Sequence, residues 1–241
     1  MSQTNTRGKL YAISTGPGAS DLITVRGARM LGELDVLYAP AGRKQGDSLA
    51  LSIVREYLSS KVQVRTRHFP MSSNDDEKIA AWDAIAQEIV HQVQQGLRVG
   101  FVSLGDAMLF STWVFLLERL EHQIDIEIIP GISSYSCIAS SAQFPLCMEQ
   151  QSMAVMSCTA PVQKLASALT DHECVVLMKV YGRFAAIKQL LGELKLLDHA
   201  VLMANASMDN ELSYRQLADV SDDIELPYFS TIIVNRAWST R

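Results

Sequence analysis

SLGDAMLFST, residues 103–112, stands between a short apolar run at 99–102 and a helical pattern at 113–120. A short apolar run bounded by turn residues is typical of a buried strand. Alternation of strands and helices is characteristic of α/β folds, in which helices cover a largely parallel sheet. The stretch therefore predicts an α/β fold, with residues 103–112 forming a loop at the carboxyl end of a strand.

Gly105 and Asp106 allow two interpretations of this loop. Glycine lets the backbone approach a ligand closely, and aspartate accepts hydrogens from hydroxyl or amino groups. Open α/β sheets bind ligands outside the carboxyl ends of their strands. The same two residues also suit an ordinary strand-to-helix turn, in which Asp106 accepts from local backbone. The dipeptide alone does not choose between a binding loop and a turn.

A second glycine-rich loop, residues 16–20, follows the first predicted strand, residues 9–15. Gly16 and Gly18 begin the G-x-G-x-x-G dinucleotide fingerprint, but Asp21 occupies its last glycine position. No Gly-Lys-Ser or Gly-Lys-Thr occurs, so the sequence also lacks a P-loop. The loop is either a simple turn or a segment whose backbone contacts a ligand that is not bound through a phosphate.

The rest of the chain continues this alternation. The first half predicts a βαβαβ arrangement, and the second half predicts a mixed sheet with fewer helices and more closing strands. We expect an N-terminal α/β domain at residues 1–122 and a C-terminal α/β domain at residues 123–241.

Composition excludes several classes of protein. The chain has 241 residues, of which 48% are hydrophobic, enough for a large core. Its formal net charge of -5 does not fit a general nucleic-acid binder, which would normally have a basic face. No apolar stretch is long enough to span a membrane, and residues 1–8 lack a signal-peptide core. The four cysteines form no CxxC pair, so no metal site is predicted. We expect a cytoplasmic protein with neither a nucleic-acid nor a membrane partner.

Other strand-end residues also have two interpretations. Ser133 and Ser134 follow a period-two strand, and they can cap the next helix or donate to a ligand. Met178 ends an apolar run and suits either a core or a binding site. His68 ends another extended segment, and it is more typical of a surface or core histidine that is hydrogen-bonded within the protein than of a ligand contact.

Four motifs in this order resemble the tetrapyrrole methyltransferases, which use S-adenosylmethionine (SAM). They are Gly16-Pro17-Gly18, Gly105-Asp106, residues 130–134 and residues 176–179, and the resemblance spans essentially the whole chain. Further stretches resemble the members that methylate C20 of cobalt-precorrin-2: residues 9–12, 38–44, 68–71, 176–180 and 227–230.

This resemblance implies two α/β domains of the tetrapyrrole methyltransferase type, SAM bound in the cleft between them, and a homodimer. Carried over by position, the residues that bind SAM are Pro17, Leu104, Gly105, Asp106, Leu109, Ser133, Ser134, Met178 and Ala206. Cobalt is expected only inside the substrate, and no protein metal site is implied.

Two positions depart from the family pattern. Ala19 and Ser20 follow Gly18 where many relatives have Gly-Asp after the proline, which puts an acidic contribution from that loop in doubt. Ala107 replaces the proline of Gly-Asp-Pro, a change that backbone contacts of Gly105 and Asp106 can survive.

The implied reaction is methylation of C20 of cobalt-precorrin-2 (cobalt-factor II) to cobalt-precorrin-3 in anaerobic cobalamin biosynthesis. Metal-free precorrin-2 is the alternative substrate, and methylation of uroporphyrinogen at other carbons is a more distant one. An alternative of another class is a non-catalytic tetrapyrrole-binding sensor.

No catalytic base is assigned from sequence. Tyr38, His68 and Lys179 are candidates for removing the C20 proton. The candidates for binding substrate carboxylates are Arg43, Lys44 and Arg183. The common alternative is that each is a solvated charge on a loop.

Overall fold

The computed structural model describes residues 8–42, 47–70 and 75–240, and the chain forms two compact units. These units are Met1–Ser133 and Ser134–Arg241, so the division falls later than the expected boundary after residue 122. The reason is strand β5 (Ile126–Ile129), which pairs in parallel with β1 (Lys9–Ser14) of the first unit. Its period-two pattern predicts a strand but not the partner strand.

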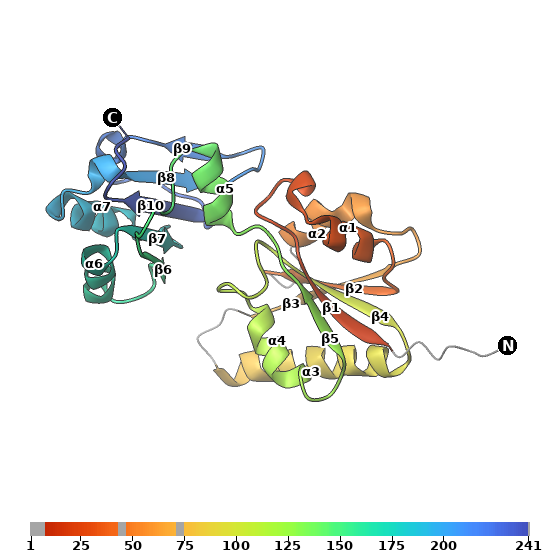
Figure 1. Ribbon diagram of the computed structural model, residues 1–241. Helices are drawn as coiled ribbons and strands as arrows, with labels where there is room; N and C mark the ends of the chain where they lie inside the picture. Colours follow the sequence, from red (N-terminus) through yellow and green to blue (C-terminus); the bar gives the residue numbers. More distant parts are fainter. Residues whose placement is uncertain (1–7, 43–46, 71–74, 241) are drawn as a thin grey trace. The chain divides into compact units, whose positions relative to one another are not determined.

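The first unit is built on a parallel sheet of strand order β3-β2-β4-β1-β5. Figure 1 shows α3 and α4 on one face of this sheet and α1 and α2 on the other. The remaining strands are β2 (Val36–Ala41), β3 (Gln63–His68) and β4 (Arg98–Ser103). The helices are α1 (Val25–Leu31), α2 (Leu49–Val54), α3 (Asp75–Gln94) and α4 (Trp113–Leu120), with short 3-10 turns η1 (Ser20–Leu22) and η2 (Arg55–Tyr57). The parallel sheet confirms the βαβαβ prediction for this half.

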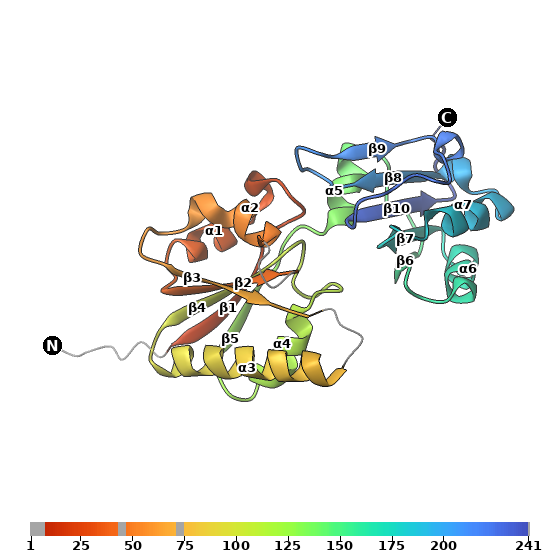
Figure 2. The ribbon, with the colours of Figure 1, turned by 180° about the vertical axis from the view of Figure 1, so that it is seen from behind.

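Alternation along the strands gives this sheet two apolar faces. Leu10 and Phe101 pack with buried residues of α3 and α4, whereas Ile13 and Val102 pack toward α1 and α2. The long helix α3 runs across one face of the sheet, as the reverse view shows (Figure 2). With both faces covered, the loops at the carboxyl edge are left to contact other molecules.

The second unit has a mixed sheet of strand order β6-β7-β10-β8-β9. Strands β6 and β7 are parallel, whereas β10 runs antiparallel to both β7 and β8, and β9 is antiparallel to β8. The strands are β6 (Met153–Ser157), β7 (Cys174–Met178), β8 (Ala200–Ala204), β9 (Leu212–Tyr214) and β10 (Ser230–Asn235). The helices are α5 (Ser134–Ser141), α6 (Val162–Asp171) and α7 (Phe184–Glu193), with 3-10 turns η3 (Leu197–His199) and η4 (Leu217–Asp219).

One apolar core holds this unit together. Leu177 and Ile232 of the sheet pack with Leu165 of α6 and Leu191 of α7. The mixed sheet confirms the prediction for the second half, and the two α/β units confirm the predicted fold class. Because β10 is antiparallel to its neighbours, its first residues lie beside the last residues of β7 and β8.

Candidate functional site

The loops after β1 and β4 are joined by their backbones in the first unit. The Gly105 N–H donates to the Gly16 carbonyl at 2.8 Å, and the Gly16 N–H donates to the Gly105 carbonyl at 3.2 Å. The Thr15 N–H also donates to the Ser103 carbonyl at 2.9 Å. Two of the four motifs of the sequence thus form one structure at the carboxyl edge of the sheet.

Asp106 ties this pair of loops to the loop after β5. One oxygen of its carboxylate (Oδ1) accepts the Met108 N–H at 2.9 Å, and the other (Oδ2) accepts the Gly131 N–H at 2.9 Å. The side chain therefore bridges loops 25 residues apart in the sequence. The bond from Met108 is the local backbone contact expected of a turn, whereas the bond from Gly131 is a long-range contact that the sequence does not indicate.

Gly131 is packed too closely to carry a side chain. A Cβ at this position would lie 2.5 Å from the Cβ of Ser14 and 2.6 Å from the carbonyl oxygen of Gly105. Ser14 is buried, and its hydroxyl accepts the Ala107 N–H at 2.9 Å. Sequence reasoning missed Ser14 and the close packing of Gly131; a Pro-Gly dipeptide directly after a predicted strand was the available signal.

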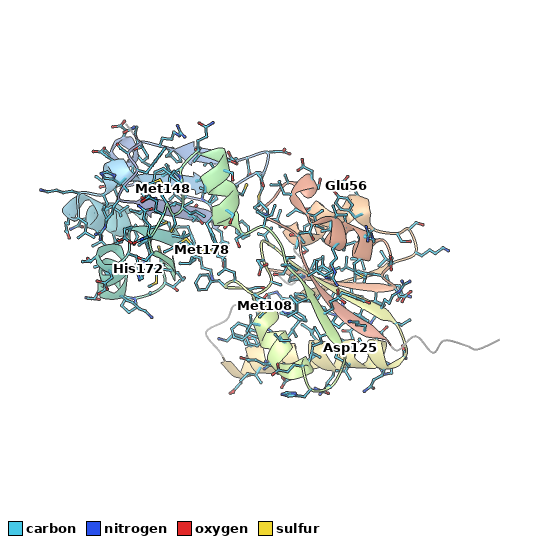
Figure 3. The ribbon with its side chains drawn as sticks, in the orientation of Figure 1. Glu56, Met108, Asp125, Met148, His172 and Met178 are labelled. Carbon is cyan, nitrogen blue, oxygen red and sulfur yellow. The ribbon has the colours of Figure 1, made fainter. Side chains whose placement is uncertain are left out.

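Gly105, in contrast, faces open space. Its φ of +70° lies in the left-handed region, and a Cβ built there meets no atom within 4 Å. Phe110 of the same loop also has a positive φ, 48°, which a bulky residue rarely adopts and which is common at functional sites. Met108 and Phe110 are 52% and 47% exposed, and Met108 lies on the loop between β4 and α4 (Figure 3). Open space beside exposed backbone is the geometry that a small-molecule site needs.

The other site residues expected in the first unit lie around these loops. Pro17 is buried next to Gly16, whereas Leu104 and Leu109 are half-buried. Ser133 is the last residue of the first unit, directly before α5, whereas Ser134 begins that helix and is the first residue of the second unit. The expected positions of the first unit therefore follow the neighbouring strands β4, β1 and β5.

Met178 and Ala206 belong to the second unit. Met178 ends β7 (Figure 3), and it is half-buried. Its carbonyl accepts the Cys158 N–H at 2.8 Å. Ala206 follows β8 and is buried. Lys179 and Asn205, beside these two residues, have φ values of 61° and 51°. Both expected residues thus stand at one edge of the mixed sheet, where the backbone is locally strained.

Tyr38 is not placed to move a proton. It is fully buried, and its hydroxyl accepts a hydrogen bond from Arg65 at 3.2 Å. Burial, reinforced by the nearby charge of Glu88, raises the pKa of Tyr38 to about 12. Arg65 and Arg67 both pair with Glu88, so this group ties strand β3 to helix α3.

The remaining candidates have different surroundings. His68 is half-buried, and its Nδ1 lies 3.3 Å from the carbonyl oxygen of Ala41. Arg183 donates to the carbonyls of Cys158 and Ala160, the latter at 2.8 Å. That guanidinium therefore holds the loop after β6, a structural contact that neither of the two interpretations open for Arg183 included. Arg43 and Lys44 lie outside the described residues.

Residues 8–42, 47–70 and 75–240 contain neither a metal site nor a membrane-spanning helix. No group of three or more His, Cys, Asp or Glu side chains there is arranged to hold a metal ion. In the same ranges no helix combines the length and the hydrophobicity that crossing a bilayer requires.

Two α/β units, with interlocked glycine loops at the carboxyl edge of a parallel sheet, define an α/β protein whose candidate small-molecule site lies at its strand ends. A family model described as Tetrapyrrole (Corrin/Porphyrin) Methylases matches residues 9–220. The chain belongs to this family and is a methyltransferase, as the resemblance of its motifs implies.

Curated relatives lie within the same family. The chain is 58% identical to the cobalt-precorrin-2 C(20)-methyltransferase of Salmonella typhimurium over 96% of this chain and 98% of the relative. It is 31% identical to the precorrin-2 C(20)-methyltransferase of a Sinorhizobium species, with 97% of each chain covered.

Solved structures share the fold. A cobalt precorrin-4 methyltransferase has a TM-score of 0.74 at 20% identity, with 98% of each chain covered. The uroporphyrin-III C-methyltransferase of Thermus thermophilus in complex with S-adenosylhomocysteine has a TM-score of 0.65 at 19% identity, with 95% of this chain and 92% of that chain covered.

Proposed function

We propose that this protein transfers a methyl group from SAM to C20 of cobalt-precorrin-2 and forms cobalt-precorrin-3. The observation that carries the proposal is 58% identity, over nearly the full length of both chains, to a relative named for that reaction. Identity to the relative named precorrin-2 C(20)-methyltransferase is 31%. The difference favours the cobalt-containing substrate over the metal-free one.

The loops of the first unit fit SAM as a ligand. Gly16 and Gly105 hold each other by two backbone hydrogen bonds, and the space beside Gly105 would be filled by a Cβ. Asp106 keeps this pair in position relative to Gly131. We propose that these backbones contact SAM, with Pro17, Leu104 and Leu109 as apolar contacts. Ser133, Ser134, Met178 and Ala206 complete the proposed set of SAM contacts.

SAM supplies a methyl group on a sulfonium, which is transferred in line to a nucleophilic carbon. The meso carbon of a reduced tetrapyrrole is electron-rich because of its neighbouring pyrrole nitrogens. The main work of the protein is therefore to align the reacting atoms and exclude water. Rigid loops suit this work, because alignment is lost when backbone moves by an ångström. Tyr38 is buried in the core, which leaves His68 and Lys179 as the side chains to test for a role in proton removal.

An anaerobic methyl-transfer assay tests the proposal. Methyl-labelled SAM is offered with cobalt-precorrin-2 and with metal-free precorrin-2, and NMR locates the labelled carbon. We expect label at C20 and a higher kcat/KM for the cobalt substrate. A higher kcat/KM for metal-free precorrin-2 would assign the protein to the alternative substrate. Binding of both SAM and tetrapyrrole without any transfer would instead support the sensor.

The family resemblance also leads us to propose a homodimer. Light scattering on the purified protein should give twice the mass of the chain across the micromolar range. A monomer mass at every concentration would contradict this assembly without affecting the proposed reaction.

A further inference from the structure

Three aromatic side chains form an exposed cluster on the second unit. Tyr181 follows β7, and Tyr228 and Phe229 directly precede β10. The rings of Tyr181 and Tyr228 have centroids 4.8 Å apart and are tilted by 49°, and those of Tyr228 and Phe229 have centroids 5.0 Å apart and are nearly perpendicular, at 87°. The three residues nevertheless remain 40%, 42% and 41% exposed. Contiguous exposed apolar surface of this kind is characteristic of binding sites.

The backbone holds this aromatic cluster rigidly. The Asn205 N–H donates to the Phe229 carbonyl at 2.9 Å, and the Val180 N–H donates to the Ser230 carbonyl at 3.2 Å. The Ser230 hydroxyl donates to the Pro227 carbonyl within the same turn. Rings presented by a fixed backbone lose little conformational entropy when they bind, which favours a role in recognition.

The same edge of the sheet contains strained backbone. Lys179 and Ser207 have positive φ values of 61° and 62°, which are costly for a residue with a side chain, and Asn205, a residue type that tolerates this region, has a φ of 51°. Such strain gathers at functional sites. Partial burial and the neighbouring Tyr181 raise the pKa of Tyr228. Uncharged aromatic rings present apolar faces and edges, so the aromatic cluster is suited to an uncharged, flat surface.

We propose that Tyr181, Tyr228 and Phe229 contact the flat face of the tetrapyrrole substrate. This inference rests on the proposed function, which supplies a macrocycle of four pyrrole rings with carboxylates at its rim. Aromatic side chains contact the faces of planar ring systems with either their own faces or their edges, whereas the rim carboxylates need cations or water. Three adjacent rings match a macrocycle better than they match the smaller adenine of SAM.

Substitution of Tyr228 and Tyr181 by leucine tests the proposal. Leucine keeps apolar volume but removes the planar ring. Uroporphyrin, a stable carboxylated tetrapyrrole, serves as the binding probe by fluorescence, and S-adenosylhomocysteine is titrated by calorimetry. The double variant should raise the Kd for uroporphyrin, and the KM for cobalt-precorrin-2, by about tenfold, since aromatic contacts contribute at this level. The Kd for S-adenosylhomocysteine should change by less than twofold.

Two further variants separate recognition from folding. Tyr228→Phe keeps the ring and should restore most of the affinity lost in Tyr228→Leu. Phe115→Leu is the matched control, because Phe115 is 42% exposed and stacks on Trp82 with a centroid distance of 4.6 Å in the first unit. It should leave both affinities unchanged.

Several outcomes would overturn the inference. An unchanged KM in the double variant, with normal wild-type turnover, would remove the cluster from the substrate site and leave the proposed function standing. A weaker affinity for S-adenosylhomocysteine alone would assign the rings to SAM. Loss of self-association alone would assign them to a second copy of the chain. A wild-type protein that neither binds nor methylates tetrapyrroles would overturn the proposed function as well.

Discussion

Removal of the Asp106 carboxylate should loosen the junction between the loops after β4 and β5. Each of its two oxygens accepts one backbone N–H at 2.9 Å, from Met108 and from Gly131. Hydrogen bonds to charged groups contribute about 1.5–3 kcal/mol each. Because Asp106 is half-buried and water can replace part of both bonds, the lower figure applies. Asp106→Ala should therefore lower the free energy of unfolding of the first unit by roughly 3 kcal/mol.

Asp106→Asn should have about half of that effect. The amide keeps one oxygen acceptor, but its NH2 group then faces the other backbone N–H, donor against donor. Glu118→Gln is a suitable control, because Glu118 is exposed on α4 and the substitution removes the same charge. Its effect should stay within about 0.5 kcal/mol.

Amide hydrogen exchange by NMR gives the local measurement, and urea unfolding followed at first-unit amides gives the free energy. We expect faster exchange at Met108 and Gly131 in Asp106→Ala, together with an affinity for S-adenosylhomocysteine weakened about tenfold, equivalent to about 1.4 kcal/mol. Native exchange at both amides with a native affinity would refute the bridging role. Weaker binding with native exchange and stability would show that Asp106 acts on the ligand itself rather than on the loops.

Further predictions concern glycines and a titrating carboxylate. Gly131→Ala should lower the melting temperature strongly, because the alanine Cβ would lie 2.5 Å from the Cβ of Ser14. A melting temperature within 1 °C of wild type, which corresponds to a change in stability of roughly 0.3 kcal/mol or less, would contradict this close packing. Gly105→Ala should lower the free energy of unfolding by about 1–2 kcal/mol, because an alanine is strained at the positive φ of this position. It should also weaken SAM binding, which calorimetry measures, and an unchanged SAM affinity would exclude a contact between SAM and the Gly105 backbone. Hydrogen bonds from the backbone and hydroxyl of Ser152 lower the pKa of Glu173 to about 2. The stabilisation by this carboxylate should thus be present above pH 4.5 and lost as the pH falls toward 2, and an NMR titration with a midpoint near 4.5 would contradict it.

Much of the fold could be predicted because it depends on local patterns. Apolar runs, period-two segments and glycine-containing turns locate the strands and the loops that follow them. The boundary between the units could not be placed in this way. The alternation at residues 126–129 is a property of one segment, whereas its pairing with β1 joins positions more than a hundred residues apart.

The candidate site shows the same division. Gly105 and Asp106 could be selected by residue type and by their place after a strand. Their surroundings were not visible in the sequence, because the Gly16 backbone and the Gly131 N–H reach them only after the sheet has formed. Tyr38 is the opposite case, since a residue named from its chemistry as a candidate for proton removal is part of the buried core.

The sequence by itself determined the α/β class, the order of the glycine loops and the family to which they belong. Only the tertiary structure decided that Asp106 bridges two loops, and that Tyr181, Tyr228 and Phe229 form one surface. Turn chemistry and hydrophobic periodicity act over a few residues and can be read in order along the chain. Hydrogen bonds and ring contacts between distant segments depend on which strands become neighbours, and the pairing of strands is set by the folded sheet as a whole.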